Sequence, residues 1–130
     1  MSFSIGTELA AAHLAATIVF ADAPLASSRI EFYSATGELL AQVPLAKPCG
    51  TVTSGVLTLA ASGLATVIKT GVPALGAWYR GDNTLVASGS VGDAASTGDF
   101  KISGGVTATG NTSPTLYLGG AVALGVVTFT

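Results

Sequence analysis

Residues 29–45, with the sequence RIEFYSATGELLAQVPL, contain the clearest structural pattern in the chain. Ile30 and Phe32 alternate with polar neighbours, and a second alternating run begins at Leu39. Residues 35–38 lie between the two runs and include a glycine, as expected of a turn. The stretch therefore predicts a β-hairpin. Because Pro44 has no N–H to donate to a neighbouring strand, the second strand is expected at a sheet edge or to end there.

The same alternation recurs on the C-terminal side of this hairpin. Residues 75–80 and 84–91 predict a second hairpin, and residues 47–50 a loop. In the last strand, a change of register predicts a β-bulge at Gly125 and Val126. In residues 115–118, Leu116 and Leu118 are both expected to point inward. Further single strands are expected at residues 56–60, 65–69, 99–103, 115–118 and 122–130.

Short strands separated by Gly, Pro, Asn and Asp turns, about one every ten residues, are typical of antiparallel sandwiches. We therefore expect a mainly β protein, an antiparallel β-sandwich or jelly-roll-like fold. The chain is expected to form one domain over residues 1–130, with an N-terminal arm or helix in 1–24 and the sandwich in 25–130.

Residues 7–20 are the one helical candidate in the sequence. Thr7 is placed to cap the helix, and Glu8 suits its first turn. The predicted packing stripe, at helical spacing, consists of Leu9, Ala12, His13 and Ala16.

The composition limits what the protein can do. Of the 130 residues, 9% are charged and 49% are hydrophobic, and the formal net charge is −2. Disorder requires low hydrophobicity and high charge, and non-specific nucleic-acid binding requires a basic surface, so neither is expected. Membrane insertion is not expected either, because a helical span needs about 20 apolar residues in a row. So little charge suggests a surface that is largely covered by neighbouring proteins.

The sequence offers no recognisable set of catalytic, cofactor-binding or metal-binding residues. His13 and Cys49 are the only residues of their types, and Cys49 is expected in a turn without a partner base. Asp82, Asp93 and Asp99 lie in or beside predicted turns without the spacing of a calcium loop, so they are expected to cap turns. We therefore expect a protein that is not an enzyme and uses no cofactor.

The tripeptide Arg80-Gly81-Asp82, which integrins recognise, falls at the tip of the second hairpin. A match of three residues arises easily by chance. Gly-Asp-Asn is also ordinary turn chemistry, and turn formation is the favoured reading.

Aromatic side chains are the main candidates for contact with another protein. Trp78 and Tyr79 are strand neighbours, so one of them is expected in the core and the other at the surface. Exposed aromatic rings on a sheet with few charges indicate protein contact, although shielding of the sheet by its own loops is an equal alternative. The interface candidates are Tyr33, Trp78, Tyr79, Tyr117 and Phe129.

The chain resembles a family of small tailed-bacteriophage virion proteins, most closely the capsid decoration, or cement, proteins. The resemblance covers most of residues 7–103 and the last ten residues, and it departs at residues 106–120. It rests on strand and turn patterns, which are Arg29-Ile30-Glu31-Phe32-Tyr33, Leu39-Leu40-Ala41, Gly55-Val56-Leu57-Thr58-Leu59, Ala77-Trp78-Tyr79-Arg80, Ala87-Ser88-Gly89-Ser90-Val91-Gly92, Asp99-Phe100-Lys101-Ile102 and Val126-Val127-Thr128-Phe129-Thr130.

The resemblance implies a protein without enzymatic activity that binds the major capsid protein and copies of itself, as a dimer or trimer. It would be assembled in the host cytoplasm and would stabilise the capsid from its surface. Two alternatives remain: a tail, baseplate or fibre-associated module that contacts the host surface, and a bacterial adhesin or fibre subunit.

Overall fold

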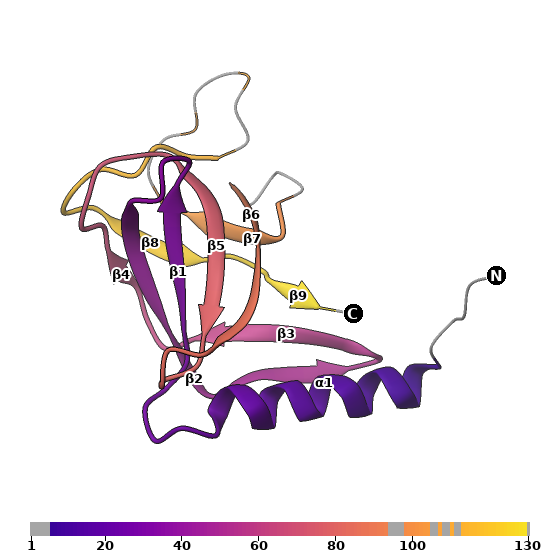
Figure 1. The fold of residues 1–130 in the computed structure, drawn as a ribbon. Coiled ribbons are helices and arrows are strands. Elements are labelled where there is room, and N and C mark those ends of the chain that lie inside the picture. Colours follow the sequence, from indigo (N-terminus) through magenta and orange to yellow (C-terminus); the bar gives the residue numbers. More distant parts are fainter. Residues whose placement is uncertain (1–5, 94–97, 105–106, 108–109, 111–112, 130) are drawn as a thin grey trace.

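The computed structural model describes residues 6–93, 98–104, 107, 110 and 113–129. It is mainly β with one helix, as predicted (Figure 1). Parts of the predicted polar loop at 93–98 and of the segment 106–120 lie outside the described residues. The elements are α1 (Thr7–Asp22), β1 (Arg29–Ser34), β2 (Leu39–Thr53), β3 (Val56–Ala61), β4 (Ala65–Thr66), β5 (Pro73–Tyr79), β6 (Leu85–Asp93), β7 (Phe100–Ser103), β8 (Ala121–Leu124) and β9 (Thr128–Phe129).

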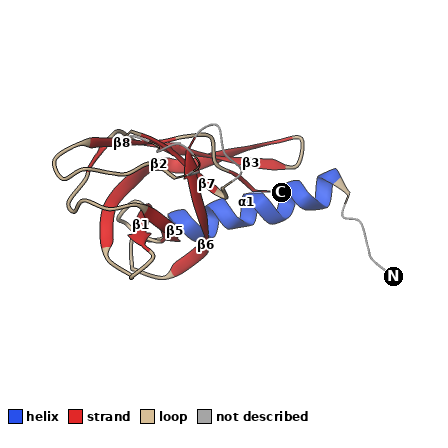
Figure 2. Cartoon of the chain, turned by 90° about the horizontal axis from the view of Figure 1, so that it is seen from above, coloured by secondary structure: helices blue, strands red, loops and turns tan. Residues whose placement is uncertain are grey.

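The strands form one curled, mixed sheet in the order β4-β8-β7-β6-β5-β1-β2-β3-β9. Strands β3 and β4 lie near opposite ends of this order, yet only residues 62–64 join them; residues 125–127 likewise join β8 to β9. A link of three residues spans at most about 14 Å, so the two ends of the sheet must approach each other. The N–H of Ile68, just after β4, donates to the Leu40 carbonyl of β2 at 2.8 Å. The sheet therefore curls into a half-barrel (Figure 2).

Both predicted hairpins are present, but one strand pairing departs from the prediction. The antiparallel pairs β1–β2 and β5–β6 are the two hairpins, and β1 also pairs with β5. Strand β7 runs parallel to β6, with Val91 opposite Phe100, whereas an antiparallel arrangement was expected throughout.

The core fills the inside of the curl with the side chains that the alternating pattern placed there. Ile30 and Phe32 of β1 are fully buried. Phe100 and Ile102 of β7 belong to the same core, although β5 and β6 lie between β1 and β7 in the sheet. Leu116 is buried as predicted, but Leu118 is exposed, because residues 116–120 turn and form only an isolated bridge between Leu116 and Gly71.

Strand β2 is much longer than predicted, because it changes partner along its length. Residues up to Pro44 pair with β1, and residues from Leu45 onward pair with β3. The predicted loop at 47–50 is instead the irregular part of this strand, and Cys49 is buried rather than placed in a turn. Pro44 is not at an edge: its carbonyl accepts a hydrogen bond from the Ser62 N–H at 2.9 Å.

The break at Gly125 and Val126 is also not a bulge within one strand. Strand β8 pairs with β4 and β7, and β9 pairs with β3 at the other end of the sheet order. The register change in the sequence therefore marks the place where the chain crosses from one end of the curled sheet to the other.

Helix α1 packs against β2 and β3, beneath the half-barrel (Figure 1). It is two residues longer than predicted, and Gly6 rather than Thr7 occupies the N-cap position. Leu14 and Ala21 are buried, and Ile18 packs against the core between them. The predicted stripe of Leu9, Ala12, His13 and Ala16 faces solvent instead. The prediction was wrong because the helix is apolar on both sides, so its sequence does not distinguish the packed face.

Candidate functional site

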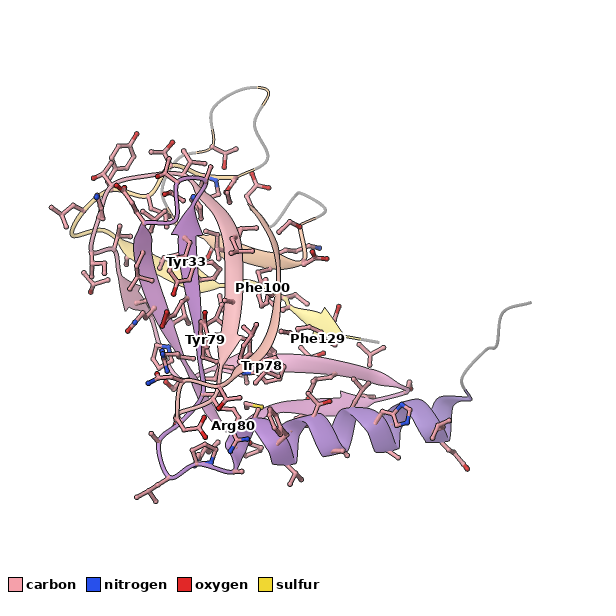
Figure 3. All side chains as sticks on the ribbon, in the orientation of Figure 1. Tyr33, Trp78, Tyr79, Arg80, Phe100 and Phe129 are labelled. Atoms are coloured by element: carbon pink, nitrogen blue, oxygen red, sulfur yellow. The ribbon has the colours of Figure 1, made fainter. Side chains whose placement is uncertain are left out.

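The five aromatic interface candidates lie in different environments, and Figure 3 labels all of them except Tyr117. Trp78 is 0% exposed and fills the core, so it presents no surface to a partner, whereas Tyr79 beside it is partly exposed, as the alternation predicted. Phe129 packs on Trp78 with ring centroids 5.5 Å apart. Tyr117 is 53% exposed. Trp78 and Phe129 are therefore brought together in the interior, and Tyr33 and Tyr79 on the outer face of the half-barrel.

A buried carboxylate lies beside these two tyrosines. Glu31 is only 5% exposed, although it points to the outer face of β1. It accepts hydrogen bonds from the Arg29 Nε at 2.8 Å, from the Gln42 Nε2 at 3.1 Å and from the Tyr33 hydroxyl. The strand register sets this arrangement, because Gln42 on β2 and Ala77 on β5 lie opposite Glu31.

Arg29 balances the charge of Glu31 and connects it to the second hairpin. Its Nη2 donates to the Asn83 Oδ1 at 2.7 Å, and its Nη1 donates to the Arg80 carbonyl at 3.3 Å. The guanidinium also lies 5.4 Å from the centre of the Tyr79 ring, a cation–π arrangement. Every charged group of this cluster is therefore already engaged within the chain.

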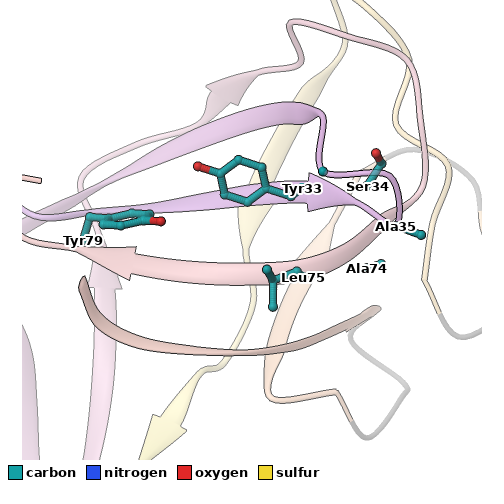
Figure 4. Close-up of a pocket in the computed structure, with 7 residues that line it drawn as sticks. Tyr33, Ser34, Ala35, Ala74, Leu75 and Tyr79 are labelled. Atoms are coloured by element: carbon teal, nitrogen blue, oxygen red, sulfur yellow. The ribbon is translucent and has the colours of Figure 1, made fainter. Parts of the chain in front are cut away.

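A pocket of about 550 Å³ opens next to the cluster (Figure 4). It is lined by residues of β1, of the β1–β2 turn and of β5, and no lining residue carries a charge at neutral pH. These residues are Tyr33, Ser34, Ala35, Gly37, Ala74, Leu75 and Tyr79. Sequence reasoning singled out the two tyrosines but not Glu31, Gln42 or Leu75. The alternation within β1 was the available signal, because it places Arg29, Glu31 and Tyr33 on one face.

The environment of Tyr33 strongly favours its protonated form. Burial raises the pKa of the Tyr33 hydroxyl well above its ordinary value, and the hydrogen bond to Glu31 and the Glu31 charge act in the same direction, with a smaller contribution from Tyr79. Tyr33 therefore remains a hydrogen-bond donor to Glu31 far above neutral pH.

We expect the Tyr33→Phe variant to lose less stability than wild-type protein as the pH rises above about 10. In the unfolded chain a tyrosine loses its proton near pH 10, whereas in the folded protein Tyr33 keeps it. The contribution of Tyr33 to the free energy of unfolding is therefore fully present below about pH 10 and decreases as the pH rises further. Removing the hydroxyl reduces this slope by up to one proton per molecule. Urea denaturation at several pH values from 8 to 11.5 measures it. An unchanged slope in the variant would contradict the assignment.

The Arg80-Gly81-Asp82 tripeptide is held by the rest of the chain. Arg80 lies over the Phe20 ring of α1, 4.3 Å from its centre, and its Nη2 is 3.3 Å from the Asp82 Oδ2 (Figure 3). A Cβ atom at Gly81 would lie 2.2 Å from the Ala26 carbonyl oxygen. Hydrogen bonds from Thr84 hold the pKa of Asp82 below its ordinary value, as expected of a turn cap. The tripeptide thus fixes the β5–β6 turn against α1.

Asp99 and Cys49 likewise make contacts within the protein. Asp99 accepts hydrogen bonds from the Ser90 N–H and hydroxyl, both at 3.0 Å. Burial, together with the nearby Asp22 carboxylate, raises the pKa of the Cys49 thiol to about 12. Among the residues that the structure describes, no three His, Cys, Asp or Glu side chains lie close enough to hold a metal ion. The same residues include no helix with the length and hydropathy needed to cross a membrane.

The tyrosine pocket, with its charge-balanced Glu31 cluster, is thus the candidate site that the structure offers. Comparison with protein families, with characterised proteins and with solved structures finds no match to the chain.

Proposed function

We propose that the protein is a non-enzymatic structural component of a bacteriophage virion, most specifically a capsid decoration protein. It would bind the major capsid protein and copies of itself, at the capsid surface, after assembly in the host cytoplasm. The resemblance in sequence pattern supports this proposal, and so does a surface that carries few charges. The finer fold description, a β-sandwich or jelly-roll-like fold, belongs to the same proposal and is supported by the way the ends of the sheet approach each other.

The observation that carries the proposal is the outer face of α1. Leu9, Val19 and Phe20 are exposed on it, Val19 to 71%, and between them lie the small side chains of Ala12 and Ala16. A surface helix normally has one apolar and one polar side, and a helix that is apolar all round is normally buried. Although His13 lies on the same face, the exposed surface of Leu9, Val19 and Phe20 is apolar and is suited to being covered by another protein.

The C-terminal end of α1 is firmly attached, as a docking element must be. The Lys47 Nζ donates to the carbonyls of Pro24 and Leu25 at 2.6 and 3.0 Å, just beyond the helix. The Cys49 N–H donates to the Asp22 Oδ2 at 3.0 Å. These contacts hold the helix on β2 from its inner side, and on the outer face Arg80 covers part of the Phe20 ring.

A second exposed apolar group lies on the segments that follow β4 and precede β8, two strands that Figure 1 places on the side of the half-barrel away from the N-terminal end of α1. It comprises Ile68, Val72, Tyr117 and Leu118, which are brought together by the Gly71–Leu116 bridge and by the Leu118 N–H donating to the Thr70 Oγ1 at 2.9 Å. Two separated apolar surfaces allow one subunit to join two neighbours. Many such contacts acting together would strengthen a lattice.

We expect Ala16→Glu to abolish attachment without unfolding the chain. A charge placed in a covered apolar contact costs about 2 kcal/mol or more, which is about a thirtyfold loss of affinity. The matched control is Ala60→Glu, which changes an exposed alanine on β3 in the same way. The measurement is co-sedimentation of wild-type and variant protein with heads of the parent phage depleted of it, followed by the heat tolerance of the heads.

Wild-type protein and Ala60→Glu should bind and raise the temperature at which the heads release DNA, and Ala16→Glu should do neither. The capsid role is refuted if wild-type protein fails to bind the heads, or if stripped heads are as heat-tolerant as intact ones. Equal binding by Ala16→Glu would remove α1 from the interface.

A tail, baseplate or fibre-associated module that contacts the host surface is the second candidate. It is favoured by the two partly exposed tyrosines that line the pocket on the outer face. Labelling the protein in images of the virion distinguishes the two candidates, because the label lies on the head in one case and on the tail in the other.

A further inference from the structure

The pocket between the β1–β2 turn and β5 combines a rigid aromatic wall with hydroxyl groups. Tyr33 is fixed by its hydrogen bond to Glu31, and Tyr79 by the Arg29 guanidinium against its ring. Leu75 lies opposite Tyr33 in the β1–β5 pair, and Ala35 and Ala74 line the end of the pocket near the turn (Figure 4). Because the strands and the Glu31 cluster already hold the two rings in place, a ligand that binds them costs little side-chain entropy.

The charges around the pocket exclude an ionic ligand. Glu31 is saturated by three donors, and Arg29 is engaged with Glu31 and Asn83. Glu38, which follows the turn, pairs with Lys69 at 2.9 Å. Among the described residues beside the pocket, a phosphate or carboxylate ligand would find no free cation, and an ammonium ligand no free anion. The ligand that fits is neutral.

Hydroxyl groups provide the polarity that the pocket has. Tyr33, Ser34 and Tyr79 each carry one, and a hydroxyl both donates and accepts hydrogen bonds. The remaining lining is apolar, and the volume of about 550 Å³ falls within the usual range of small-molecule sites. A matching ligand has an apolar face for the rings and hydroxyl groups around its rim. The pyranose ring of a sugar has this combination, since its axial C–H bonds form an apolar face.

We propose that this pocket binds a neutral saccharide, with a pyranose ring stacked on Tyr79 or Tyr33 and its hydroxyl groups meeting Ser34 and the tyrosine hydroxyls. The site binds without cleaving, because glycoside hydrolysis uses two carboxyl groups and the pocket lining contains none. This inference does not depend on the proposed capsid role, since the pocket lies on β1 and β5 and the docking face lies on α1.

The test is a titration of the full chain with the methyl glycosides of glucose, galactose and N-acetylglucosamine, followed by amide chemical shifts and calorimetry. We expect at least one glycoside to bind with shifts confined to the β1–β2 turn and β5, and to be recovered unchanged. Tyr79→Ala should weaken this binding about tenfold, the value of one aromatic stacking contact. Tyr79→Phe, which keeps the ring, should weaken it about threefold.

Tyr117→Ala is the matched control, because Tyr117 is exposed but does not line the pocket. This variant should bind the glycosides with the same affinity as wild-type protein. Leu75→Glu tests the same site independently of Tyr79, because Leu75 is exposed and a charge there should abolish binding while the circular dichroism spectrum stays unchanged. The inference is overturned if none of the three glycosides binds at 50 mM, if the shifts map elsewhere, or if a proline-rich peptide binds the pocket in their place. Retention of glycoside binding by Ala16→Glu separates this result from the test of the capsid role.

Discussion

Trp78→Ala is expected to lower the free energy of unfolding by about 3–5 kcal/mol, the range for truncating a buried aromatic side chain. Trp78 is the largest fully buried side chain, and it supports more than its own strand. Phe129 of β9 packs on it at 5.5 Å and contacts Phe100 edge-on at 6.3 Å. Losing the indole therefore also loosens the final strand. Urea denaturation followed by far-ultraviolet circular dichroism measures the change.

Trp78→Phe is the informative control for this prediction. The Trp78 Nε1 is buried and finds no hydrogen-bond partner among the described residues. Phenylalanine keeps most of the apolar contact and removes that unpaired N–H, so the expected loss is only about 1–2 kcal/mol. Equal losses in the two variants, or a loss below about 1 kcal/mol in Trp78→Ala, would contradict the role of the indole in the core.

Gly50→Ala is expected to destabilise the protein by about 2–3 kcal/mol, because the site has no space for a Cβ atom. An added Cβ would lie 2.4 Å from the Thr58 carbonyl oxygen and 2.9 Å from the Leu57 Cδ1. The oxygen belongs to the paired backbone of β3, so the β2–β3 pairing itself has to shift. This is the part of β2 on which α1 packs, so the helix should fray at the same time. Thermal unfolding by circular dichroism reports both effects.

Gly63→Ala provides the matched control, since a Cβ atom at Gly63 meets nothing within 4 Å. It should change stability by less than about 0.5 kcal/mol, or increase it slightly by restricting the unfolded chain. If the two alanine variants unfold at the same temperature, close packing at Gly50 is not what the β2–β3 pairing depends on.

The candidate site was predictable only in part. Alternation along β1 placed Arg29, Glu31 and Tyr33 on one face, and the site is built on that face. Nothing in the linear pattern indicated that Glu31 would be buried, because its burial depends on Gln42 and Ala77, which the strand register brings opposite it.

By itself, the sequence determined part of the local structure of this protein. Alternation of period two identified both hairpins and the inward positions of Ile30, Phe32, Phe100 and Ile102, because side chains on a strand alternate between its two faces regardless of what the strand packs against. The low charge content followed directly from the composition. These properties depend on neighbouring residues alone.

Only the tertiary structure decided which strands lie side by side and which surfaces remain uncovered. The pairings of β1 with β5, of β4 with β8 and of β3 with β9 each join residues far apart in the chain. The packed face of α1 was decided in the same way. With apolar side chains on both sides, the helix could bury either one, and contact with β2 and β3 selects the side of Leu14 and Ala21.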